Sequence, residues 1–250
     1  MSFTDIKDIE LPSVLTLQQS TTTKESELVE KTLAKMLRRL MAIVGKDPNF
    51  PGNVEALKQS YGLRVYSLLR KALQEQYIIG MNYVEKSFGI ETFISGKDEF
   101  NLSRATDAAV EAFWFKVQVA SQNIMQVQFE EAFGQEEILP FNLNYLWLLL
   151  SVSLSTMTLA QSTISKTVEL VEANNIDTRR VQFKWIAQLD EKTCLVLPNG
   201  RPGCRILNGT VWEFGQIAEI PTPGGRGLSP THYNCRCRIV VILDNKEKLL

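Results

Sequence analysis

Five side chains with metal-binding or nucleophilic chemistry lie close together in the last quarter of this 250-residue chain. They are its four cysteines and its single histidine: Cys194, Cys204, His232, Cys235 and Cys237. Thiolate and imidazole groups are the usual ligands of a structural zinc ion, which takes four of them in a tetrahedron. Two prolines and two glycines between Cys194 and Cys204 predict a tight reversal that brings these cysteines together. We therefore expect a zinc site built from four of the five residues, with one to spare.

Two other roles for the cysteines stay open on the sequence alone. A disulfide or a simple core role would also explain them, although disulfides belong to oxidising compartments. The N-terminal run MSFTDIKDIELPS has acidic residues where a secretory signal has basic and apolar ones, so export is not expected. Catalysis by a cysteine with His232 as its base would use one residue of each kind and leave three cysteines unexplained.

The residues around this candidate site also follow a longer pattern. Its parts are a tryptophan, an aspartate followed by Thr-Cys, a second cysteine, a glycine turn and the ending Pro-x-His-x-x-Cys-Arg-Cys. In this chain they are Trp185, Asp190, Thr193, Cys194, Cys204, Asn208, Gly209, Pro230, His232, Cys235, Arg236 and Cys237. The pattern resembles the C-terminal half of the Mu F-like phage minor head proteins, over about residues 140–242. In that family the first two cysteines are usually two residues apart, whereas nine residues separate them here.

The resemblance implies a structural minor head protein of a tailed phage or phage-like particle. By the same resemblance, it would associate in few copies with the portal protein inside the head, and contact packaged double-stranded DNA during packaging or ejection. The major capsid protein or a scaffold protein is a further partner to consider. The expected location is the interior of the phage head in the virion, and the host cytoplasm during assembly. The alternative function is a zinc-stabilised nucleic-acid-binding module.

Sequence signals of common enzyme classes are absent. The chain has no GxGxxG motif, no Walker lysine, no Gly-x-Ser-x-Gly motif and no zinc-deaminase ligand set. A toxin of the kind sometimes fused to Mu F-like domains would need a group of catalytic residues before residue 140, and none is evident. We therefore expect a protein that is not an enzyme.

Basic residues gather in the C-terminal part, although the whole chain has a net charge of −1. Residues 175–250 carry seven arginines and four lysines against seven acidic residues, a net charge of +4. Clustered arginines bind phosphate groups, so the candidate nucleic-acid-binding residues are Arg201, Arg205, Arg226, Arg236 and Arg238. Neutralisation of a thiolate-rich metal site is an equally good explanation of the same arginines.

Hydrophobic periodicity predicts an α+β protein in three parts. Residues 1–25 show no periodicity and are expected to form a flexible arm. Residues 26–137 have apolar residues at helical spacing and predict a bundle of long helices. The predicted helices cover about residues 25–44, 53–88 and 103–133, the last with Ser103 as its N-cap.

Residues 138–250 form the predicted Mu F-like α+β domain. Its first stretch, residues 138–165, holds no charged residue, and only about 16 of these residues are strongly apolar, fewer than a membrane span needs. We therefore expect a central helix buried on all sides, and contact with a membrane is not expected. Three β-prone segments follow, separated by turns: VQFKWIAQ, TVWEFGQI and RCRIVVIL.

Overall fold

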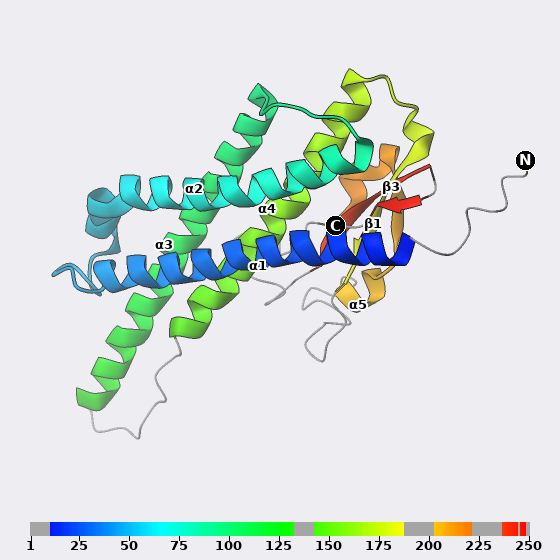
Figure 1. Cartoon of the computed structure of the whole chain (residues 1–250). Helices are drawn as coiled ribbons and strands as arrows, with labels where there is room; N and C mark the ends of the chain where they lie inside the picture. Colours follow the sequence, from blue (N-terminus) through cyan, green and yellow to red (C-terminus); the bar gives the residue numbers. More distant parts are fainter. Residues whose placement is uncertain (1–10, 133–142, 188–202, 222–236, 245, 249–250) are drawn as a thin grey trace, which may run out of the picture.

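Four long helices followed by a small antiparallel sheet make up most of the described part of the chain in the computed structural model (Figure 1). The structure describes residues 11–132, 143–187, 203–221, 237–244 and 246–248. The helices α1 and α2 lie side by side, and α3 and α4 cross them as a second pair (Figure 1). Their bounds are α1 Leu11–Val44, α2 Val54–Phe88, α3 Gly96–Ala132 and α4 Leu143–Ala173.

The starts of the helices correct two sequence predictions. Helix α1 begins at Leu11, so the second half of the segment predicted to be an arm is helical. Helix α3 begins at Gly96 and not near Ser103. Its first turn is closed by Ser95, whose hydroxyl accepts a hydrogen bond of 3.2 Å from the Asp98 backbone N–H, while the Asp98 carboxylate accepts one of 2.9 Å from the Ser95 N–H. This reciprocal pair is a capping box, with aspartate in the position usual for glutamate.

Helix α2 follows the prediction closely, because both of its ends carry strong local signals. The side chain of Asn53 accepts a hydrogen bond from the Ala56 N–H at 3.0 Å and caps the first turn. Gly89 ends the helix in the left-handed conformation, at φ +69°, and its N–H bonds to the carbonyl oxygen of Glu85. Gly62 lies inside the helix without interrupting it.

The sheet has four strands in the order β2-β1-β3-β4, and every neighbouring pair is antiparallel. Its strands are β1 Val181–Ile186, β2 Val211–Glu213, β3 Arg238–Leu243 and β4 Lys246–Lys248. The first three fall within the three predicted β segments, and helices with a small sheet agree with the predicted α+β class. The second segment is confirmed only in part, because its strand ends at Glu213 and a 3-10 helix begins at Phe214. Three one- or two-turn helices complete the described part: η1 Thr178–Arg180, α5 Cys204–Leu207 and η2 Phe214–Glu219.

Helix α4 is the predicted central helix, and it packs against α1, α2, α3 and β3. It is the one helix in the described residues that is long and apolar enough to cross a membrane, by length and composition only. In its most apolar window 67% of the residues are buried inside the protein. Several of its buried hydroxyls bond to backbone carbonyl oxygens one turn earlier, for example Thr163 to Leu159 at 2.8 Å and Thr167 to Thr163 at 2.7 Å.

Two clusters of buried apolar residues share α4. Its first half packs with α1, α2 and α3, and its second half packs with the sheet and the end of α2. Helices α2 and α4 come very close at Gly80 of α2, where an added Cβ would lie 1.8 Å from the hydroxyl oxygen of Ser162 on α4. Glycine is therefore required at position 80 for this helix contact, whatever its effect on helix propensity.

Candidate functional site

Two of the five predicted metal ligands lie in described residues, and the structure buries both in one place. Cys204 is the first residue of α5 and is 4% exposed, and Cys237 directly precedes β3 and is 3% exposed. Both belong to the buried cluster beside the sheet. Cys194, His232 and Cys235 lie outside the described residues. Within the described part, no group of three or more Cys, His, Asp or Glu residues is arranged to hold a metal.

The turn at Asn208 and Gly209 holds the end of β1, where Trp185 is fully buried. The Asn208 side-chain oxygen accepts a hydrogen bond of 2.9 Å from the Ala187 N–H. Gly209, at φ +83°, donates its N–H to the Trp185 carbonyl oxygen at 2.9 Å. On the other side of β1, Trp185 pairs with Ile239, two residues after Cys237. Residues of the sequence pattern that are far apart along the chain thus meet at one end of the sheet.

The indole N–H of Trp185 has no hydrogen-bond partner among the described residues, although it is buried. The buried cluster at this end of the sheet therefore contains apolar side chains, the thiols of Cys204 and Cys237, and the indole N–H of Trp185.

The arginines predicted to bind nucleic acid are described only at Arg205 and Arg238; Arg201, Arg226 and Arg236 lie outside the described residues. Arg205 is exposed on α5. Burial lowers the pKa of Arg238 from its ordinary value, and the carboxylates of Glu27 and Glu30 on α1 act in the opposite direction. Arg238 therefore faces acidic residues of this chain.

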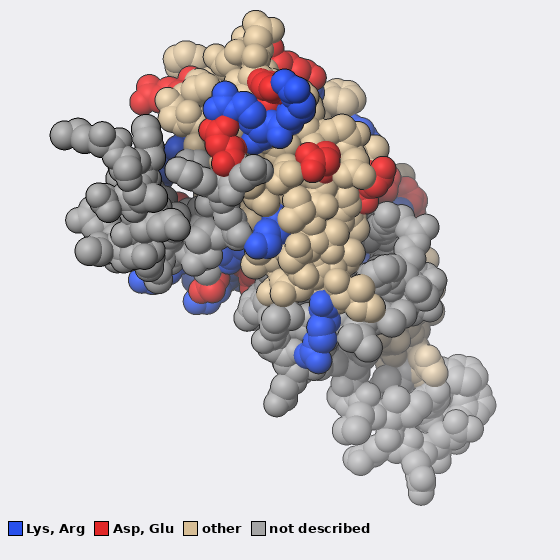
Figure 2. Space-filling model, turned by 90° about the vertical axis from the view of Figure 1, so that its right-hand side faces the viewer, with Lys and Arg blue, Asp and Glu red and all other residues tan. Residues whose placement is uncertain are grey.

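Charges of both signs are mixed on the end of the molecule that carries the sheet. Figure 2 shows this face, where blue basic and red acidic groups alternate and surround an uncharged area. Two exposed ion pairs contribute to the mixture: Arg179 with Asp177, and Arg180 with Asp244. On the described part of this face, the basic residues form no continuous surface.

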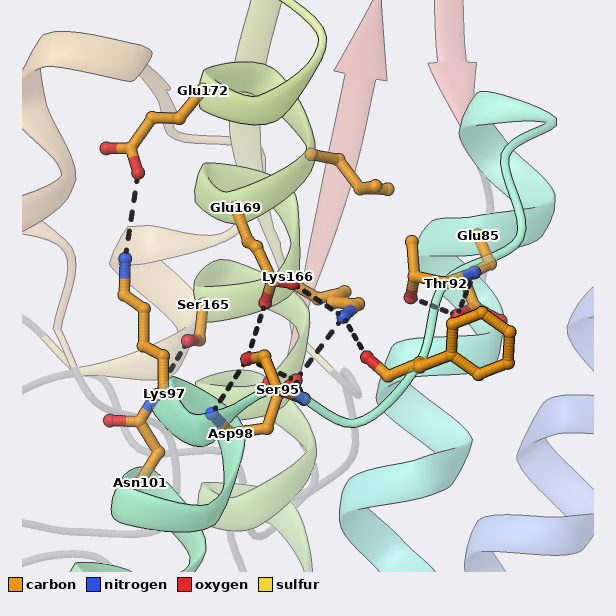
Figure 3. Close-up of polar contacts among 12 residues, drawn as sticks. Glu85, Thr92, Ser95, Lys97, Asp98, Asn101, Ser165, Lys166, Glu169 and Glu172 are labelled. Atoms are coloured by element: carbon orange, nitrogen blue, oxygen red, sulfur yellow. Dashed lines mark hydrogen bonds and ion pairs between the residues drawn. The ribbon is translucent and has the colours of Figure 1, made fainter.

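A buried polar cluster that the sequence did not predict joins α2, α3 and α4 (Figure 3). Its centre is Lys166 of α4, which is fully buried. The Lys166 ammonium lies 3.3 Å from an Asp98 carboxylate oxygen, 3.1 Å from a Glu169 carboxylate oxygen and 3.1 Å from the Phe93 carbonyl oxygen. Since an ammonium has three N–H donors, these three acceptors use all of its hydrogen-bonding capacity.

The Asp98 carboxylate, 1% exposed, is held by several groups at once. The Tyr77 hydroxyl donates to it at 3.0 Å, and the Ser95 N–H and hydroxyl each lie 2.9 Å from its other oxygen. Burial raises the pKa of Asp98, but the bonds from Ser95 and Tyr77 and the charge of Lys166 outweigh it, so the pKa lies below its ordinary value of 3.8. Burial also raises the pKa of Tyr77. Asp98 is therefore ionised and Tyr77 neutral at neutral pH.

This cluster fixes the connection between α2 and α3, residues 89–95, against α4. Lys166 has no exposed surface and no unused donor, so it cannot attack a substrate from solvent. Two signals in the sequence mark the cluster: the pattern Ser95-x-x-Asp98 before a helix, and Lys166 as the first charge after a long uncharged stretch. Its role is to position helices.

Comparisons with protein-family models, with curated proteins and with solved structures find no match to this chain.

Proposed function

We propose that this chain is a structural minor head protein of a tailed phage or phage-like particle, without catalytic activity of its own. One observation supports the proposal above the others. Trp185, Cys204, Asn208, Gly209 and Cys237, which carry much of the resemblance to the Mu F-like family, gather around one end of the sheet. Residues far apart in the chain are expected to occur together in a family pattern when they build one local structure.

A zinc ion is the group that this end of the sheet would hold. Cys204 and Cys237 supply two sulfur donors in one buried cluster, which fits the chemistry of a structural zinc site. Two further ligands would come from Cys194, His232 and Cys235. The ion would staple the segment after β1 to the start of β3, and it would add no reaction.

Docking on the portal protein inside the head is the proposed task of the molecule, with the major capsid or a scaffold protein as further possible neighbours. The long helices α1 and α2 offer an extended surface for such contact (Figure 1). Contact with packaged DNA would involve the C-terminal arginines, of which Arg205 is exposed in the described part.

Purified particles provide the direct test. The chain, and the portal protein encoded by the same genome, would be quantified by mass spectrometry in particles treated with nuclease, and their complex would be captured from a co-expression. We expect few copies per particle and a complex with the portal protein. Gly209→Val strains a backbone at φ +83° and should lower incorporation, whereas Gly215→Ala, with no atom near the added methyl, should not. Absence from particles, together with no portal complex, would overturn the proposal.

Binding measurements on the purified chain at different salt concentrations distinguish portal docking from the alternative function, a nucleic-acid-binding module. Binding to a DNA duplex through arginines falls steeply with salt because condensed counterions are released. Portal docking through apolar and polar contacts should change little over the same salt range. A chain that binds DNA with a steep salt dependence, and is not found in particles, would favour the alternative.

A further inference from the structure

An exposed stripe of six residues runs along α3, on the face opposite to the one that packs in the core. We call these residues the α3 stripe: Phe100, Arg104, Asp107, Ala108, Glu111 and Phe115. Their spacing of three and four places them on a single face of the helix. Phe100 is 62% exposed and Phe115 is 40% exposed, which is unusual for two phenylalanines on one helix face.

The charged residues of the α3 stripe have no ion-pair partner among the described residues. Arg104 lies over the ring of Phe100, with its guanidinium carbon 6.0 Å from the ring centre. Asp107 and Glu111 are one helical turn apart and carry the same charge, an arrangement that destabilises an isolated helix slightly. A positive group placed against Asp107 and Glu111 would remove this repulsion.

The order of residues in the α3 stripe is complementary to its own reverse. If two copies of α3 lie antiparallel, with a two-fold axis between positions 107 and 108, Phe100 of one copy lies opposite Phe115 of the other. In the same register Arg104 lies opposite Glu111, and Asp107 opposite Ala108. Each pair occurs twice, because an interface with two-fold symmetry uses the same patch on both subunits.

We propose that the α3 stripe binds the α3 stripe of a second copy of this chain, in this antiparallel register. Arg104 of each copy then lies opposite Glu111 of the other, and the small Ala108 near the axis permits close approach of the helices. The phenylalanines at the two ends bury apolar surface about 22 Å apart along the helix, at 1.5 Å per residue. Charge complementarity sets the register, and the aromatic pairs contribute the apolar contact. The inference is independent of the proposed function.

Charge reversal tests both the interface and its register. Arg104→Glu gives a chain with acidic groups at positions 104 and 111, and Glu111→Arg gives one with basic groups at both. Each variant alone should dimerise about tenfold or more weakly than the unaltered chain, since two attractions become two repulsions. An equimolar mixture of the two variants should form heterodimers, because every 104–111 pair is again of opposite charge. Sedimentation velocity over a range of concentrations measures dimerisation of the unaltered chain, of each variant alone and of the mixture.

The control is Lys35→Glu, which reverses an exposed charge on α1 and should leave dimerisation unchanged. Circular dichroism of each variant checks that it is folded. An unaltered chain that stays monomeric up to about 0.5 mM, well above the range of useful micromolar affinity, would overturn the proposal. A dimer that is insensitive to both reversals, or a variant mixture that stays monomeric, would overturn it equally.

Discussion

The hydroxyl of Tyr83, on α2, accepts a hydrogen bond of 2.9 Å from the backbone N–H of Val241, in the middle of β3. The two residues are 158 positions apart in the chain, and both are buried. The bond joins helix α2 to β3, the strand that lies between β1 and β4 in the sheet. Helix α2 thus supports the sheet directly, beside the support that α4 gives.

Removing this hydroxyl should destabilise the protein measurably. Tyr83→Phe keeps the ring but leaves the Val241 N–H buried without this acceptor, which costs roughly 1–3 kcal/mol. The free energy of unfolding from urea denaturation measures the loss. Tyr66→Phe, at a half-buried position of the same helix, is the control and should change the free energy by less than about 0.5 kcal/mol. Equal effects of the two substitutions would contradict the role given to Tyr83.

The same substitution at two glycines of α2 should have opposite effects. Gly80→Ala would place a methyl group against the Ser162 hydroxyl and is expected to cost about 1–3 kcal/mol. Gly62→Ala meets no atom within 4 Å and should stabilise the helix by about 0.5–1 kcal/mol. Thermal or urea unfolding measures both. Ser162→Gly in the Gly80→Ala background removes the clashing side chain and should recover part of the loss; no recovery would count against the close helix contact.

The buried cluster should make stability depend on pH in the acid range. The pKa of Asp98 is lowered in the folded protein, so its contribution is fully present above the unfolded value of about 3.8 and is lost as pH falls through the lower folded value. At about pH 7, Asp98→Asn should cost about 3 kcal/mol, because Lys166 loses a buried partner. At about pH 2 the two proteins should differ much less in unfolding free energy.

Urea denaturation at several pH values measures this convergence. Glu75→Gln removes an exposed carboxylate of α2 and serves as the control, with little effect at any pH. A gap between the unaltered protein and Asp98→Asn that stays constant down to the acid limit would show that ionisation of Asp98 does not contribute.

Metal analysis tests the proposed zinc site. Protein purified under reducing conditions should contain about one zinc ion per chain, with thiols that react only after a chelator is added. Cys204→Ser and Cys237→Ser should each lower the zinc content. Val240→Ala creates a cavity in the same buried cluster without removing a ligand, and should keep the zinc. Absence of zinc together with four reactive thiols would exclude the site.

Local patterns in the sequence predict most of the elements. Strand β1 is evident because Val181, Phe183 and Trp185 alternate with polar residues, and the structure buries these three. Helix α4 is evident from its long uncharged stretch. Strand β4, Lys246–Lys248, escaped prediction because its charged residues carry no apolar alternation. The predicted start of α3 at Ser103 is too late, because the true cap at Ser95 precedes a polar first turn and the apolar face begins further along.

The buried cluster could not be found by periodicity. Its parts come from Tyr77, the segment around Ser95 and Asp98, and the last turns of α4 near Lys166, and only the packing of three helices brings them together. From sequence alone, a lysine at the polar end of an apolar helix is predicted to be exposed to solvent. All five candidate metal ligands can be identified from the sequence. The structure describes the surroundings of two of these residues, Cys204 and Cys237.

The strand order has a consequence for synthesis on the ribosome. β3 lies between β1 and β4, yet it follows β1 by more than fifty residues. Until residue 243 has emerged from the exit tunnel, the backbone N–H and C=O groups on that edge of β1 lack their partners. The four helices can pack earlier, since all of them precede the sheet. Nascent chains stalled shortly before β3 should therefore hold folded helices and an unfinished, chaperone-accessible strand.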